Sequence, residues 1–190
     1  MIHFYSYLSR MKHIKRWGLM KNTEQENIKE HSFDVAVTAH ALALIGNTYF
    51  GKNHDIHKIT ELALFHETSE VITGDLATPI KYFNPEIKES FGRIENIANE
   101  RLLSMLPDEL KDSYRPIMMH EGDPNYVLVK AADKICAYVK CVEEIKSGNA
   151  EFTKAKANLY REICGYDLPE VKYYIENCLP SFELTLDELN

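Results

Sequence analysis

Two glutamates and a histidine interrupt the stretch LALFHETSEVITGDLATP, which begins like the buried face of a helix. At helical spacing, one stripe of the helix predicted over 54–75 comprises Ile59, Ala63, His66 and Glu70. Glu67 lies at the edge of the same stripe. An isolated carboxylate in a protein core is costly unless it is paired or bound to a metal. The spacing therefore indicates a buried polar site rather than simple packing.

Two other segments also place an ionisable residue on an otherwise apolar helical face. Asp133 shares a helical face with Val129 and Cys136, and His31 precedes Val35 by one helical turn. If their helices converge, two imidazoles and two carboxylates would form a nitrogen and oxygen ligand set for Zn²⁺, Mn²⁺, Co²⁺ or Fe²⁺. The candidate ligands are His31, His66, Glu67 and Asp133.

Ordinary structural interpretations remain open for these residues. Taken singly, each is more often a surface group, a helix cap or a satisfied buried polar residue. Asp133 could pair with Lys130 or Lys134, and Glu67 and Glu70 could lie on a solvated helix edge. His40 continues an apolar stripe, and we expect it to be a packed core histidine.

Long helices are predicted to position these groups, because helical periodicity dominates and strand-like alternation is nearly absent. Helices are expected at 30–47, 54–75, 84–106 and 124–149, with shorter ones near 3–14, 108–113, 150–163 and 168–178. The residues expected to face the core are Phe33, Val37, Ala41 and Leu44 in the first of these, and Ile87, Phe91, Ile94 and Ile97 in the third. Asp55 is the expected N-cap of the second, which would end near Gly74. The fold class predicted is all-α, a helical bundle forming a single domain over residues 1–190.

Composition limits the possible partners. The formal charge is −7, with 45% apolar and 27% charged residues, so a long polyanion such as a nucleic acid polymer is not expected to bind. No apolar run is long enough to predict a membrane span, and no secretory signal is expected at the N-terminus. Without an export signal, the four cysteines, which form no C-x-x-C pair, are expected to be reduced thiols. The cytoplasm is the expected location because no targeting signal is recognised.

The candidate ligands also carry a family resemblance. His31-Ser32, His66-Glu67 and Asp133 resemble the H…HD…D signature of the HD-domain metal-dependent phosphohydrolases. The flanking segments SRMKHIKRWGLM, ENIKEHSFDVAVTAHALALI, HETSEVITGDLATPIKYFNPEI, KAADKICAYVKCVEEIKSGN and PSFELTLDEL are similar to bacterial HD-domain 5′-deoxynucleotidases. The likeness extends over nearly the whole chain.

This resemblance implies an all-α homodimer that hydrolyses 2′-deoxynucleoside 5′-monophosphates to the deoxynucleoside and phosphate. It implies one divalent cation per site, with Co²⁺, Mn²⁺ or Cu²⁺ effective, held by the four candidate ligands. Glu70 would be the acid or base near the attacked phosphate, and Arg16 would assist catalysis. The residues implied to contact substrate are Arg16, Trp17, His31, Glu67, Asp75, Leu76, Ala77, Thr78 and Asp133.

One position departs from the signature, because Glu67 stands where the family has Asp. The extra methylene displaces the carboxylate by roughly 1 Å, whereas ligation tolerates about 0.2 Å in metal–oxygen distance. The site is expected to survive with a changed metal affinity or rate.

Several other readings stay open at this stage. The chain could be an HD-domain protein with weakened catalysis that binds nucleotide or metal, or an HD phosphohydrolase acting on triphosphates or cyclic dinucleotides. A bundle whose metal serves only its stability is a third possibility. Without the resemblance, Arg16 would be a solvated cation, Trp17 a core anchor, and Glu70 the partner of a nearby lysine.

Overall fold

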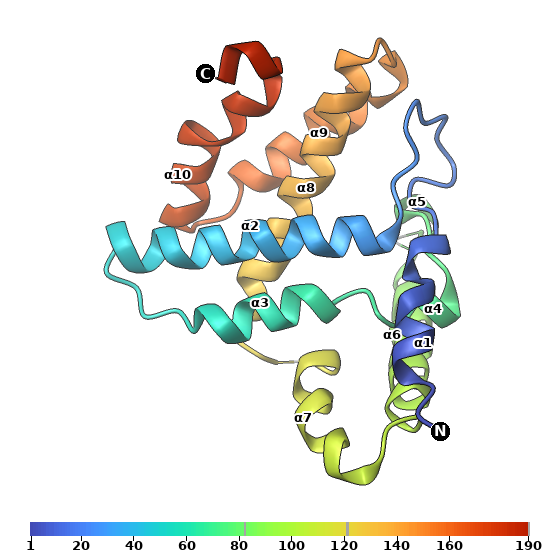
Figure 1. Ribbon diagram of the computed structural model, residues 1–190. Helices are drawn as coiled ribbons and strands as arrows, with labels where there is room; N and C mark the ends of the chain where they lie inside the picture. The colour runs from blue at the N-terminus through green and yellow to red at the C-terminus, as the bar shows by residue number, and fades with distance from the viewer. Residues whose placement is uncertain (82, 121, 190) are drawn as a thin grey trace. The chain divides into compact units, whose positions relative to one another are not determined.

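The structure is a computed structural model that describes residues 1–81, 83–120 and 122–189 (Figure 1). The described residues form helices and turns without a β-strand, so the all-α prediction is confirmed. One isolated antiparallel bridge joins Lys15 to Asn27. None of the described helices is both long and apolar enough to cross a membrane.

The chain forms two compact units. The first comprises residues 1–21, 25–33 and 64–123, and the second residues 22–24, 34–63 and 124–190. Two helices contribute residues to both units, α2 (Ile28–Tyr49) and α3 (Ile56–Phe65). A single domain over the whole chain stays a prediction.

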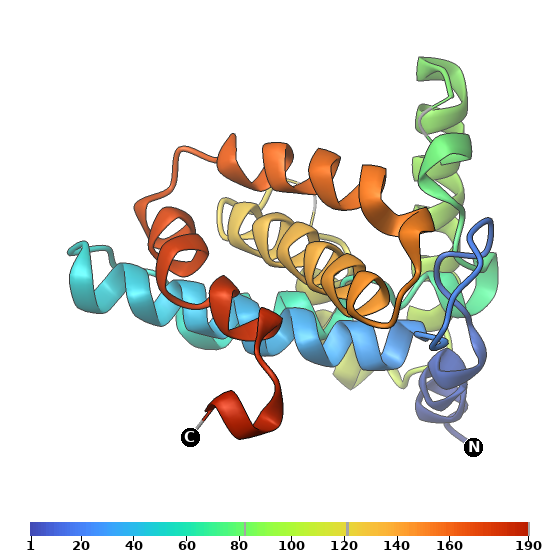
Figure 2. The ribbon, with the colours of Figure 1, turned by 90° about the horizontal axis from the view of Figure 1, so that it is seen from above.

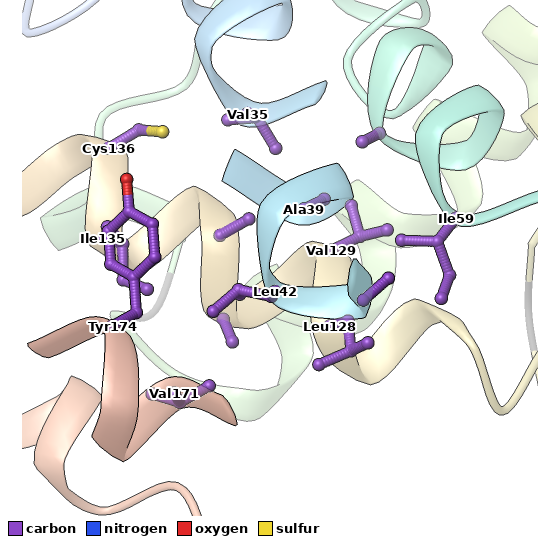
Figure 3. Packing of buried hydrophobic residues seen from close by; sticks show 14 of the residues in the cluster. Val35, Ala39, Leu42, Ile59, Leu128, Val129, Ile135, Cys136, Val171 and Tyr174 are labelled. Atoms are coloured by element: carbon purple, nitrogen blue, oxygen red, sulfur yellow. The ribbon is translucent and has the colours of Figure 1, made fainter. Parts of the chain in front are cut away.

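The second unit is built around α8 (Tyr126–Lys146), which lies within the helix predicted over 124–149. Figures 1 and 2 show α9 (Thr153–Cys164) lying alongside α8. The other elements of this unit are η2 (Ala150–Phe152), α10 (Pro169–Asn177), η3 (Leu179–Glu183) and η4 (Leu186–Leu189). Leu42, Ile59 and Leu128 meet in its core and are fully buried (Figure 3). The four cysteines are free thiols, as predicted.

The buried face of α2 differs from the predicted one. Phe33, Val37 and Leu44 are exposed, at 63%, 54% and 47% respectively. The buried side chains are those of Val35, Ala36, Ala39, Leu42 and Ala43. His40 is also exposed, so its assignment as a core histidine was wrong. Apolar residues occupy more than one face of this helix, so periodicity alone could not select the buried one.

The first unit has its own apolar core. Phe4 of α1 (Phe4–Leu8) lies 4.9 Å from the Tyr114 ring, edge to face, and Phe65 packs against the same ring at 5.7 Å. The other buried members of this cluster are Leu102, Leu103, Leu106, Ile117 and Met118. Its remaining elements are η1 (Ser9–His13), α4 (Glu70–Thr73), α5 (Thr78–Lys81), α6 (Pro85–Leu103) and α7 (Asp108–Met118).

The packing of α6 also corrects the sequence analysis. Ile94 and Ile97 were expected to face the core but are 48% and 69% exposed. The helix instead buries Ala98, Asn99 and Leu102, and the Asn99 amide donates to the Met118 carbonyl at 3.1 Å. A buried amide is not marked by hydrophobic periodicity, because its burial depends on the carbonyl that it meets.

The segment predicted as one helix over 54–75 is interrupted. Asp55 does cap α3, accepting from the Lys58 N–H at 3.0 Å, but α3 ends at Phe65. The Phe65 carbonyl accepts both from the Thr68 N–H and from the Thr68 hydroxyl, which lies 2.9 Å away. Local hydrogen bonds of this kind compete with helix continuation. His66 and Glu67 therefore lie in a turn between α3 and α4 rather than on a helical stripe.

Candidate metal and phosphate site

An antiparallel pairing of two short segments brings Arg16 beside Glu26. The Arg16 N–H donates to the Glu26 carbonyl at 3.1 Å, and the Ile28 N–H donates to the Ile14 carbonyl at 3.1 Å. This pairing places the two side chains on adjacent backbone segments. The Arg16 Nε then donates to Glu26 Oε2 at 3.1 Å. The backbone pairing thus fixes the main chain of Arg16, and the Glu26 carboxylate orients its guanidinium.

The start of α2 is fixed by a capping box that presents His31. Asn27 Oδ1 accepts from the backbone N–H groups of Lys29 and Glu30, at 3.0 and 3.1 Å. Glu30 Oε2 in turn accepts from the Asn27 N–H at 3.4 Å. The reciprocal bonds satisfy free N–H groups of the first turn. His31 follows in that turn and is fully buried.

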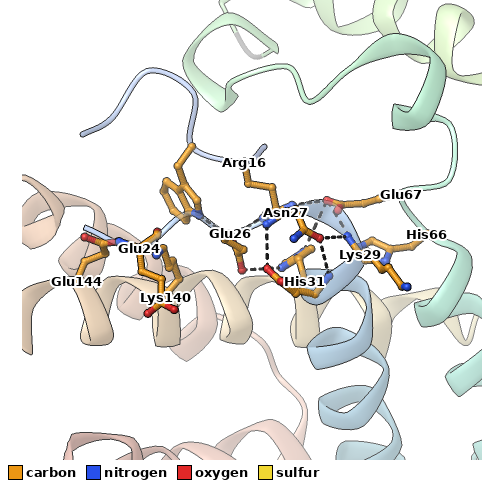
Figure 4. Close-up of polar contacts among 12 residues, drawn as sticks. Arg16, Glu24, Glu26, Asn27, Lys29, His31, His66, Glu67, Lys140 and Glu144 are labelled. Carbon is orange, nitrogen blue, oxygen red and sulfur yellow. Dashed lines mark hydrogen bonds and ion pairs between the residues drawn. The ribbon is translucent and has the colours of Figure 1, made fainter. Parts of the chain in front are cut away.

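Oε1 of Glu67 is the common neighbour of the cluster (Figure 4). Arg16 Nη1 donates to it at 2.5 Å. His31 Nε2 and His66 Nε2 lie 3.6 and 3.8 Å from the same oxygen. His31, His66 and Glu67 each offer a ligand atom, and these three atoms lie within 4.8 Å of one another.

This geometry fits a divalent cation. Two ligand atoms of a tetrahedral site with bonds of about 2.1 Å stand about 3.4 Å apart. The observed 3.6 and 3.8 Å between the imidazole nitrogens and Glu67 Oε1 need a contraction of only a few tenths of an ångström. Two imidazoles and a carboxylate are also ligands that transition-metal dications accept. The longer Glu67 side chain thus still brings Oε1 near both imidazole nitrogens.

The fourth predicted ligand belongs to the second unit. Asp133 lies near the middle of α8 and is half-buried. Of the lysines considered as its partner, Lys134 forms an ion pair with Glu162 at 3.1 Å. The role of Asp133 as a ligand stays a prediction.

Glu26 is a site residue that the sequence analysis missed. Its carboxylate is only 12% exposed and also accepts from the Trp17 indole Nε1 at 2.9 Å. Burial acts to raise the pKa of Glu26, but nearby His31 and the Arg16 charge outweigh it and hold that pKa below its usual value. The neighbouring capping box was a readable signal for the start of α2, but nothing in it marked Glu26 as the facing partner of Arg16.

Glu70 and Asp75 are acidic groups in an unusual electrostatic setting. Burial raises the pKa of Glu70 to about 9, and the Glu67 and Asp75 carboxylates add to the rise. Burial also raises the pKa of Asp75, against the lowering effect of Arg16. These directions apply to the cation-free protein, because a bound dication favours the ionised form of nearby carboxyls.

The predicted substrate loop follows directly after α4. Gly74 ends this helix at φ 73°, a conformation that favours glycine. Asp75, Leu76 and Ala77 are half-buried in an irregular segment, and Thr78 begins α5. The assignment of this loop to substrate binding stays a prediction.

Trp17 adopts a backbone conformation that a bulky residue rarely takes, with φ at 58°. Such strain persists only where surrounding interactions hold it. The indole is half-buried and is tied to Glu26, so Trp17 is part of the polar cluster rather than a simple core anchor.

Comparison with known proteins identifies the family of this chain. Residues 3–182 match the family described as 5′-deoxynucleotidase YfbR-like. The chain belongs to this family of 5′-deoxynucleotidases. The 5′-deoxynucleotidase of Vibrio cholerae is 50% identical over 190 residues, covering 99% of this chain and 98% of the relative. That of Shewanella oneidensis is 48% identical over 192 residues, covering 100% and 98%.

Solved structures show that the fold is that of HD-domain phosphohydrolases, as predicted. The HD-domain phosphohydrolase of Listeria innocua aligns with a TM-score of 0.84 at 23% identity, covering 95% of this chain and 88% of that one. The HD phosphohydrolase of cyanophage S-2L aligns at 0.65 and 21% identity, covering 93% and 96%. That protein was solved with dA and one catalytic Zn²⁺.

Proposed function

We propose that this chain hydrolyses 2′-deoxynucleoside 5′-monophosphates to the deoxynucleoside and phosphate, using one divalent cation per site. The observation that carries the proposal is the buried cluster in which Arg16, His31 and His66 all approach Glu67 Oε1 in a member of this family. His31, His66 and Glu67, with Asp133 as the fourth ligand, would hold the cation. When bound, the cation would neutralise phosphate charge and acidify water at the site.

Arg16 is proposed to hold the phosphate. A planar guanidinium presents several N–H donors and can bind two phosphate oxygens at once. Its Nε is engaged by Glu26, so the terminal nitrogens are the groups available to exchange Glu67 for a phosphate oxygen. With Glu67 engaged as a ligand, these terminal nitrogens would donate to a phosphate oxygen instead.

Glu70 is proposed to handle the proton. It is buried, within the same unit as Arg16 and Glu67. Its carboxyl would either deliver a proton to the leaving O5′ oxygen or orient the attacking water. Both roles require a carboxyl group beside the scissile phosphate.

Trp17 and the residues Asp75 to Thr78 are proposed to hold the sugar. Asp75 would accept a hydrogen bond from the 3′-hydroxyl. The Trp17 indole would form a wall that leaves no room for a 2′-hydroxyl. Discrimination of this kind excludes ribonucleotides by contact rather than by reading the base.

The decisive experiment is a phosphate-release assay on deoxy- and ribonucleoside 5′-monophosphates. The protein is stripped with a chelator, and Co²⁺, Mn²⁺, Zn²⁺, Cu²⁺ or Mg²⁺ is then added back. We expect cation-dependent release from the deoxy substrates and little from the ribo substrates. Phosphate release that persists after chelation, or that is faster with ribonucleotides, would refute the proposal.

A second function is supported by the ion pair between Arg16 and Glu67. This contact engages both the residue proposed to bind phosphate and a predicted cation ligand. If the pair persists when the cation is present, the chain would bind nucleotide or cation with little turnover. Glu67→Asp decides between the two functions, because only this second one predicts that the variant gains activity over an inactive wild type.

The homodimer and the cytoplasmic location stay predictions. Exposed Val37 and Leu44 on α2 support self-association, because a second copy could cover them. Sedimentation velocity on the wild type and on Val37→Glu tests it, with a dimer expected for the first and a monomer for the second. A monomeric wild type would refute the homodimer prediction.

A further inference from the structure

We propose that Glu26 is a positioning residue whose single buried carboxylate orients the phosphate-binding Arg16, the sugar-facing Trp17 and the imidazole of His31. The proposal rests on the proposed function for what these three residues do, but not for the contacts that hold them. It assigns a role to a residue that lies outside the predicted ligand set and outside the predicted substrate contacts.

The two oxygens of Glu26 serve different neighbours. Oε2 accepts from Arg16 Nε at 3.1 Å and from Trp17 Nε1 at 2.9 Å. Oε1 faces His31 Nδ1 at 3.6 Å. That last distance is longer than a formed hydrogen bond, and a movement of a few tenths of an ångström would close it. One carboxylate therefore contacts the residues proposed to bind phosphate and sugar, and also faces the imidazole proposed to bind the cation.

The contact with His31 has a chemical consequence. A carboxylate beside Nδ1 favours the tautomer that carries its proton there, which leaves the Nε2 lone pair for a cation. Nε2 is the atom that faces Glu67 Oε1, at 3.6 Å. The arrangement thus directs the ligand atom of His31 toward the proposed cation position.

The contact with Trp17 has a conformational consequence. The backbone of Trp17 is held at φ 58°, a strained conformation for a bulky residue. The Nε1 bond to Glu26 is one interaction that offsets this strain. Without it, the indole is expected to leave its position beside Arg16.

Glu26→Gln tests the proposal with little change in volume. A glutamine has one acceptor oxygen and one donor NH₂ group. If the NH₂ group faces His31 Nδ1, the imidazole must accept there, and Nε2 carries the proton. If it faces Arg16 and Trp17, it meets two donors and those contacts break. Either orientation disrupts one side of the cluster.

Glu24→Gln is the matched control. It makes the same chemical change two residues away, at an exposed side chain. The residue enters the described hydrogen bonds through its backbone groups, the N–H to Glu144 and the carbonyl to Lys140. The variant should therefore behave as the wild type.

Two measurements do not depend on turnover. The first is Co²⁺ affinity of the stripped protein, from titration calorimetry, which we expect to fall about 10–100-fold in Glu26→Gln relative to Glu24→Gln. The second is fluorescence of Trp17, the only tryptophan, whose emission should shift to the red and become easier to quench. If Glu26→Gln matches Glu24→Gln in both, the proposal is wrong.

A third measurement needs no variant and so remains decisive if Glu26→Gln does not fold. Long-range ¹H–¹⁵N correlation spectra of the stripped wild type, at a pH where imidazole is neutral, report the tautomer of His31. We expect the proton on Nδ1, and a proton on Nε2 would overturn the proposal. A wild type that releases no phosphate would count against the proposed function alone, because none of the three readouts uses substrate.

Discussion

Glu144→Gln is expected to destabilise the second unit strongly at neutral pH. Glu144 is 1% exposed and forms an ion pair with Lys140, which is itself 6% exposed, at 2.6 Å. It also accepts from the Thr23 N–H and hydroxyl, at 2.9 and 2.6 Å, and from the Asn149 amide at 2.8 Å. The substitution leaves the buried Lys140 ammonium without its carboxylate. Breaking one partner of a buried pair in this way costs about 3–5 kcal/mol.

The pH dependence of this loss follows from the pKa of Glu144. Burial acts to raise it, but the hydrogen bonds from Lys140 and Thr23 outweigh burial and hold that pKa well below its usual value of 4.5. A depressed folded-state pKa contributes stability that is fully present above the unfolded pKa and is lost as the pH falls toward the folded one. The wild type should therefore lose its advantage over the variant below about pH 4.5, by up to about 1.4 kcal/mol per pH unit.

Urea unfolding of the wild type and Glu144→Gln, followed from about pH 7 to about pH 3, measures both effects. Glu176→Gln is the control, because Glu176 is an exposed residue of α10 in the same unit and should change stability by less than about 0.5 kcal/mol. A loss below about 1 kcal/mol for Glu144→Gln at neutral pH would refute the argument. So would a difference that stays constant as the pH falls.

The remaining predictions concern the site. Glu70→Ala should lower phosphate release by at least about 10²-fold with Co²⁺ affinity nearly unchanged, and retention of more than about a tenth of the wild-type rate would remove its proton-transfer role. Trp17→Ala should raise turnover of ribo relative to deoxy substrates, measured as a ratio of kcat/KM values, and an unchanged ratio would remove Trp17 from that wall. Chelation should abolish release, and Co²⁺ or Mn²⁺ should restore it. A chelated protein that melts at a lower temperature, with its rate unchanged, would indicate a purely structural cation.

Much of the local structure was predictable, because it depends on neighbouring residues. The Asp55 cap and the long α8 follow from residue types within a few positions of one another. Helix formation is governed by such local preferences together with apolar periodicity. The all-α class could therefore be read from the sequence.

The choice of buried face was less predictable. In α2 the spacing of Phe33, Val37 and Leu44 fits a core stripe as well as that of Val35, Ala39 and Leu42, yet only the second set is buried. Both sets are apolar and helical in period, so their local patterns are equivalent. The neighbouring helices that cover one set decide between them.

The sequence by itself determined the residue types of the candidate site. Two imidazoles and two carboxylates in an otherwise apolar setting predicted a cation site, and the family resemblance added the phosphate chemistry and the role of Arg16. The tertiary structure decided how His31, His66, Glu67 and Arg16 meet, and that His66 and Glu67 lie in a turn. It alone revealed Glu26, because that carboxylate reaches Arg16 across a backbone pairing. Which groups face one another across such a pairing depends on how distant segments pack, and no spacing along the chain records it.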